Sequence, residues 1–135
     1  MSYYSNWASL RDELRDDLTA HYSVRDLRSS LAAIGKSRVR SVAAQSLPFL
    51  RRYIASSPSK RLTMLSKMDD GERLSTRFLA WQIADLAVRQ QDILPAAARG
   101  KGYRETLGEV ADAALQRWML PFPQWPFGKP DPFEE

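Results

Sequence analysis

The sequence contains no cysteine and only one histidine among its 135 residues. The lack of thiols excludes a disulfide framework, a zinc site with cysteine ligands and a catalytic cysteine. The chain also has no run of about 18 apolar residues, so it predicts no transmembrane helix. Its first residues carry neither the basic nor the apolar segment of a secretory signal. These absences predict a cytoplasmic protein with no membrane contact, no metal site and no cofactor.

Catalytic patterns are scarce as well. His21 is the only imidazole, and no serine or carboxylate stands at a spacing typical of a hydrolase triad. The sequence has no Gly-rich phosphate loop and no dinucleotide-binding glycine pattern. Acidic pairs one turn apart, such as Asp12 and Asp16, come without the loop of oxygen ligands that calcium sites use. We therefore expect a protein that is not an enzyme and has no small-molecule substrate.

Positive charge is concentrated in the middle of the chain. The net charge is +4, but residues 25–67 hold ten basic residues and one acid, a net charge of +9. The flanking thirds, 1–24 and 68–135, have net charges of −2 and −3. Seven of the ten central bases are arginines, whose planar guanidinium suits phosphate. This distribution favours a polyanion or an acidic protein as partner, and its alternative is a merely solvated basic face.

Apolar residues recur at helical spacing, and alternating strand patterns are nearly absent, so the sequence predicts an all-α fold. We expect a compact bundle of five or six helices in a single domain over residues 1–120. The first three helical patterns cover about residues 6–20, 24–34 and 38–46, and a fourth opens or kinks from Pro48. A short helix is expected from Ser59 to Met68 and a long one over 72–92. A last amphipathic stripe covers residues 107–118. The long pattern is apolar on two sides, which predicts a central helix.

The segment from Leu31 to Val42 resembles the helix-hairpin-helix family, whose hairpin holds a nucleic-acid phosphate on backbone N–H groups. Gly35 matches the second glycine of that motif, and the basic stretch follows it. Ala32 and Ala33 stand where the family has proline and its first glycine. The resemblance covers about a dozen residues. The alternative interpretation is a glycine that ends one helix, followed by Ser37 as the N-cap of the next.

A second basic group follows this segment, with Tyr53 among its members. Several such charges on one face would bind nucleic-acid backbone without reading its sequence. The predicted nucleic-acid-binding residues are Gly35, Lys36, Arg38, Arg40, Arg51, Arg52, Lys60 and Arg61.

Residues 121–135 hold five of the eight prolines and predict an extended C-terminal arm rather than a helix. Large aromatic anchors spaced by proline are typical of docking segments. The predicted partner-binding residues are Phe122, Trp125, Phe127 and Phe133. The alternative is that these rings fold back over the bundle and seal its core.

Together these patterns predict a small non-catalytic helical subunit that contacts nucleic-acid backbone through its basic face, within a larger nucleoprotein assembly. The arm would contact a protein partner in that assembly. The alternative is an adaptor, chaperone or immunity-type inhibitor whose basic face docks an acidic protein and never meets nucleic acid.

Overall fold

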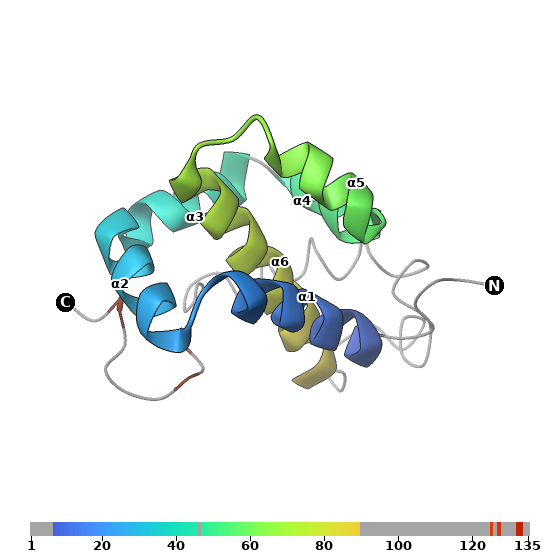
Figure 1. The fold of residues 1–135 in the computed structure, drawn as a ribbon, viewed down its shortest axis with the longest axis horizontal. Coiled ribbons are helices and arrows are strands. Elements are labelled where there is room, and N and C mark those ends of the chain that lie inside the picture. Colours follow the sequence, from blue (N-terminus) through green and yellow to red (C-terminus); the bar gives the residue numbers. More distant parts are fainter. Residues whose placement is uncertain (1–6, 46, 90–124, 126, 128–131, 134–135) are drawn as a thin grey trace.

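The computed structural model describes residues 7–45, 47–89, 125, 127, 132 and 133. These residues form six helices and no strand, which confirms the predicted all-α class (Figure 1). The helices are α1 (Trp7–His21), α2 (Val24–Ile34), α3 (Lys36–Gln45), α4 (Leu47–Ala55), α5 (Pro58–Leu65) and α6 (Asp70–Arg89). Within the described part of the chain, no helix is both long and apolar enough to cross a membrane. The amphipathic stripe expected over 107–118 lies outside the described residues.

Helix α6 is the centre of the fold, as its two-sided apolar pattern predicts. It packs against α1, α2, α3 and α4, and its side chains from residue 74 to residue 84 are all buried. Its most extensive partner is α1, which crosses it in Figure 1 and buries one continuous stripe. That stripe consists of Trp7, Leu10, Leu14 and Leu18. Because both helices bury apolar faces along their length, the α1–α6 pair holds most of the core.

Two helices begin with side-chain N-caps, and one of them, α6, begins at Asp70, two residues before its predicted start at Glu72. The Ser23 hydroxyl accepts a hydrogen bond from the Asp26 N–H at 3.1 Å and so caps α2. The Asp69 carboxylate accepts from the Glu72 N–H at 2.8 Å and caps α6 in the same way. Each of these side chains binds an N–H group that has no partner within its helix.

Two other starts differ from the expectation. Helix α5 begins at Pro58, one residue before the predicted start at Ser59, and has Ser57 as its N-cap. Proline fits there because the first helical residue needs no N–H partner. Helix α3 begins at Lys36, so Ser37 lies inside the helix and is not its cap.

The described rings of the C-terminal arm pack against α6. Trp125 and Phe133 are 9% and 8% exposed, and both contact Phe78, with ring centroids 6.5 and 6.0 Å apart. Phe127 is half-buried and stacks on Trp81 at 5.5 Å. A protein partner would therefore reach Trp125 and Phe133 only after the arm leaves α6, and their role in partner binding stays a prediction.

The other expected anchor of the arm, Phe122, lies outside the described residues.

Asp85 lies on the face of α6 that meets α1. The expected partner of this carboxylate on helical spacing is Arg89, whose side chain is outside the described set. Among the described side chains, the Arg11 guanidinium of α1 lies 3.8 Å from the carboxylate, across the helix interface. This ion pair joins α1 to α6, and the pair with Arg89 stays a prediction.

Candidate nucleic-acid interface

The predicted basic residues fall into two groups at opposite ends of the molecule. The first surrounds the single-residue junction between α2 and α3 (Figure 1). Gly35 has a φ of 88°, and its N–H donates to the Leu31 carbonyl. Its own carbonyl accepts from Val39, which is fully buried. A left-handed φ is the conformation that favours glycine, so this position ends α2 and starts α3 within one residue.

Acidic residues at the start of α6 offset the charge of this junction. The Arg38 guanidinium lies 3.9 Å from the Asp69 carboxylate, and both side chains are exposed. Hydrogen bonding to the Glu72 N–H holds the pKa of Asp69 below its ordinary value, so this carboxylate stays ionised at neutral pH. Lys36 is half-buried, and the side chain of Arg40 is outside the described set. The junction is therefore less positive than its sequence indicates.

The second group lines an open hollow between α4 and α5. The hollow has a volume of about 610 Å³, and none of the described side chains that line it is acidic. Its two cations are Arg52 of α4 and Lys60 of α5, and both are exposed. Arg51, the neighbour of Arg52, is half-buried and outside the hollow. The remaining lining residues are Phe49, Ala55, Ser56, Ser57 and Met64. We call this feature the α4–α5 hollow.

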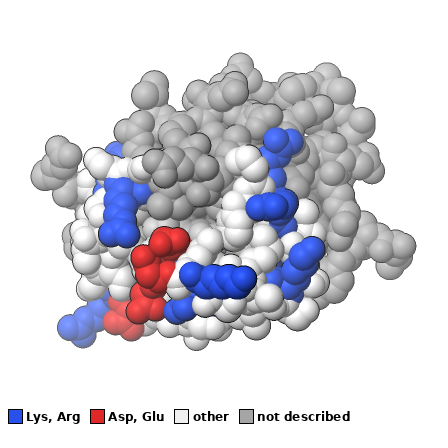
Figure 2. Space-filling view, turned by 90° about the horizontal axis from the view of Figure 1, so that it is seen from above, with Lys and Arg blue, Asp and Glu red and all other residues white. Residues whose placement is uncertain are grey.

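The two groups of basic residues differ in whether acidic side chains lie near them. Figure 2 views the molecule from above, with the α5 side to the right. Lys and Arg side chains on the right have no acidic side chain between them among the residues drawn in colour, whereas the acidic group lies on the left beside other bases. On this face the described bases thus do not form one continuous surface. The part without nearby acids is the α5 side.

Helix α5 divides the α4–α5 hollow from a smaller cavity beneath it. Lys60 and Met64 face the hollow, whereas Arg61 and Leu65, each one position later, face the cavity. This division follows from the helical period, because neighbouring positions differ by about 100° around the axis.

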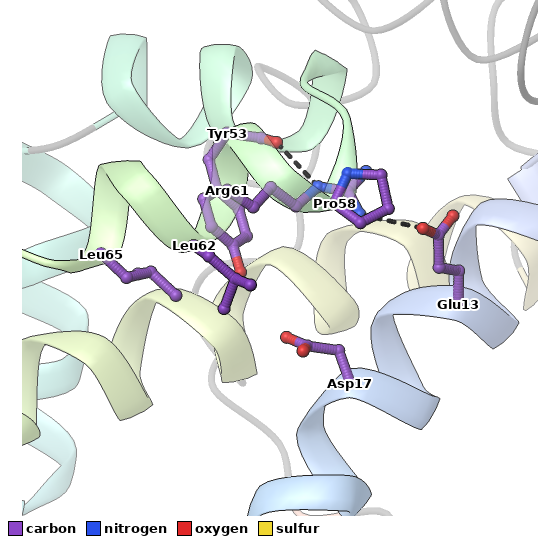
Figure 3. Close-up of a pocket in the computed structure, with 7 residues that line it drawn as sticks. All are labelled: Glu13, Asp17, Tyr53, Pro58, Arg61, Leu62 and Leu65. Carbon is purple, nitrogen blue, oxygen red and sulfur yellow. Dashed lines mark hydrogen bonds and ion pairs between the residues drawn. The ribbon is translucent and has the colours of Figure 1, made fainter.

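Arg61 of α5 is 4% exposed, and its guanidinium contacts both α4 and α1. Its Nε and Nη2 atoms each donate at 3.1 Å to the carbonyls of Tyr53 and Ile54, in the last turn of α4. Its Nη1 atom lies 3.5 Å from the Glu13 carboxylate of α1 (Figure 3). Because the guanidinium is committed to these acceptors, we leave Arg61 out of the nucleic-acid-binding surface.

The smaller cavity has a volume of about 80 Å³ and lies between α1, α4 and α5. Figure 3 shows Glu13 and Asp17 entering it from α1 and Tyr53 from α4. The Tyr53 hydroxyl is buried and has no hydrogen-bond partner among the described residues. Burial, together with the Asp17 charge, raises the pKa of Tyr53 to about 12. The cavity is therefore a packing gap around a neutral phenol.

This phenol gives a testable stability prediction. Tyr53→Phe removes an unpartnered buried hydroxyl, so we expect the free energy of unfolding at neutral pH to rise by about 1 kcal/mol. A phenol with a pKa near 12 when folded and near 10 when unfolded contributes stability below pH 10 that is lost as the pH rises toward 12. Between pH 7.5 and pH 11.5, the free energy of unfolding in urea should therefore fall more for the wild type than for Y53F. Equal losses in the two proteins would contradict this account of Tyr53.

Comparisons with known proteins place the chain in no established group. No family model matches it, and neither a curated protein nor a solved structure shows significant similarity to it.

Proposed function

We propose that this chain is a small non-catalytic helical protein that binds the nucleic-acid backbone through the α4–α5 hollow, as a subunit of a larger nucleoprotein assembly. The observation that carries the proposal is a concave site whose described lining residues include two exposed cations and no acid. Phosphates supply the matching anions, and binding to them is independent of base sequence.

The surroundings of the hollow support an anionic ligand. Arg52 lies over the Phe49 ring, 5.9 Å from its centroid, which orients the guanidinium at the rim of the hollow. Lys60 stands in the first turn of α5, where the helix dipole adds positive potential. The Ser56 hydroxyl donates to the Arg52 carbonyl, and the Ser57 hydroxyl accepts from the Lys60 N–H as the N-cap of α5. The two side-chain cations are therefore the groups that meet a phosphate.

Charge reversal in the hollow tests the proposal. We expect the double variant Arg52→Glu with Lys60→Glu to bind a fluorescent oligonucleotide about a hundredfold more weakly than the wild type. Each lost charge-assisted hydrogen bond is worth roughly 1.5 kcal/mol, which is about tenfold in Kd. Fluorescence anisotropy at about 50 mM salt provides the measurement, because phosphate binding is strong at low ionic strength.

A matched control changes the same net charge at the other end of the molecule. Arg25→Glu with Lys36→Glu alters α2 and the α2–α3 junction and should leave Kd within about threefold, because neither residue lines the α4–α5 hollow. The helix-hairpin-helix resemblance predicts the opposite order of effects. If the wild type binds no oligonucleotide at this salt concentration, the proposal fails, and an acidic protein becomes the partner to seek.

A further inference from the structure

The α4–α5 hollow has an apolar floor that phosphate binding alone does not require. Phe49, Ala55 and Met64 line this floor and are half-buried, whereas the cations stand at the rim. The volume of about 610 Å³ lies within the range of pockets that enclose small organic ligands. A flat apolar group that is attached to a phosphate would use both parts of the site.

The Phe49 ring is supported from within the fold. It stacks on Tyr53 with a centroid distance of 6.4 Å and an interplanar angle of 23°, and Tyr53 is fully buried. The Arg52 guanidinium adds a second planar group at 5.9 Å from the Phe49 centroid. Aromatic rings and guanidinium planes are the surfaces on which proteins stack unpaired bases. The hollow thus combines a supported aromatic ring with an exposed guanidinium plane.

We propose that the α4–α5 hollow accepts one unstacked nucleobase of a single strand against Phe49, while Arg52 and Lys60 bind the flanking phosphates. This inference rests on the proposed function and adds to it a preference for single strands. Bases in a duplex are stacked and paired, so they reach Phe49 only at the cost of opening the helix. An acidic peptide would engage the cations without needing the ring.

The test compares three oligonucleotides on the full-length protein by fluorescence anisotropy: a thymidine strand of about 12 nucleotides, an abasic strand of the same length, and the matching duplex. The abasic strand keeps every phosphate and lacks the bases. We expect the wild type to bind the thymidine strand about tenfold more tightly than either other probe, since stacking one base on an aromatic ring is worth 5-fold or more.

The variant Phe49→Leu removes the ring and keeps an apolar side chain in the floor. We expect it to bind the thymidine and abasic strands equally, at the affinity that the wild type has for the abasic strand. Should F49L fail to fold, as seen by circular dichroism, the wild-type comparison of the two strands still decides the question.

Each outcome bears on a separate claim. Equal wild-type affinity for thymidine, abasic and duplex probes overturns the base-binding inference and leaves phosphate binding standing. A lack of binding to all three probes overturns the proposed function and this inference with it. Binding of thymidine and abasic strands in the predicted ratio, with F49L abolishing the difference, supports the assignment of the ring.

Discussion

Arg61→Met should lower the free energy of unfolding by about 3 kcal/mol, because it leaves two buried carbonyls of α4 without their donor and a partly buried carboxylate without its cation. The substitution keeps an apolar stem and deletes the guanidinium. It leaves the carbonyls of Tyr53 and Ile54 without their side-chain donor and the Glu13 carboxylate without its cation. Urea unfolding at pH 7, followed by circular dichroism, measures the change.

Glu13→Gln is the matched control for the same contact. Burial raises the pKa of Glu13 although Arg61 opposes this shift, so the ionised carboxylate is incompletely compensated for its loss of water. Glutamine keeps an acceptor oxygen for Arg61 and has no charge to desolvate. We expect E13Q to change the stability by less than about 1 kcal/mol. Equal losses for E13Q and R61M would mean that the ion pair, rather than the capping of α4, holds α5.

Phe133→Ala should lower the free energy of unfolding by about 3 kcal/mol or more, as is typical for truncation of a buried aromatic side chain. Phe133 is 8% exposed and contacts Phe78, whose ring also meets Trp125 and Trp81. Loss of the ring leaves a cavity beside the central helix. We expect Trp125→Ala to have an effect of the same size for the same reason. Thermal unfolding followed by tryptophan fluorescence measures both.

Leu62→Ala is the control for these truncations, because Leu62 is 55% exposed and its loss should cost less than about 0.5 kcal/mol. The core and docking interpretations of the arm make opposite predictions here. If F133A unfolds at the wild-type temperature and only impairs assembly with a partner, the ring acts as a docking anchor and the contact with Phe78 contributes little to stability.

Helix positions and the identity of the central helix could be predicted because both depend on local periodicity. The stripe from Trp7 to Leu18 and the two-sided pattern around Phe78 are properties of residues that are close in sequence. The predicted start at Ser59 lies two residues after the true cap, Ser57, because proline is itself accepted as the first residue of a helix. Such errors concern the ends of helices and leave the architecture unchanged.

Whether a given basic side chain is buried or exposed could not be predicted from local patterns. Arg61 and Lys60 are neighbours in sequence, yet one is buried beneath α5 and the other is exposed above it. The partner of Arg61 on α1, Glu13, is 48 residues away, and that of Arg77, Asp17, is 60 residues away. Contacts at such separations depend on how the helices pack, and a charge count over residues 25–67 contains no information on packing.

Arg61 shares one local pattern with Arg73. The Arg61 Nε donates to a carbonyl eight residues earlier, and the Arg73 Nε makes the same contact with Leu65, also eight residues earlier. In both cases a helix ends, a short linker follows, and an arginine near the start of the next helix caps the free carbonyls. An arginine in the first turns after a short linker is therefore a candidate cap for the preceding helix.

The central claim is that Arg52 and Lys60 meet phosphates, and the salt dependence of binding tests it most directly. On a single strand each phosphate contact contributes about 0.7 to the slope of log Kd against log salt concentration. The variant Arg52→Gln with Lys60→Gln should therefore bind with a slope lower by about 1.4 than the wild type, whereas Arg25→Gln with Lys36→Gln should leave the slope unchanged. An unchanged slope in the first variant, or an equal decrease in the second, would contradict the assignment of the α4–α5 hollow.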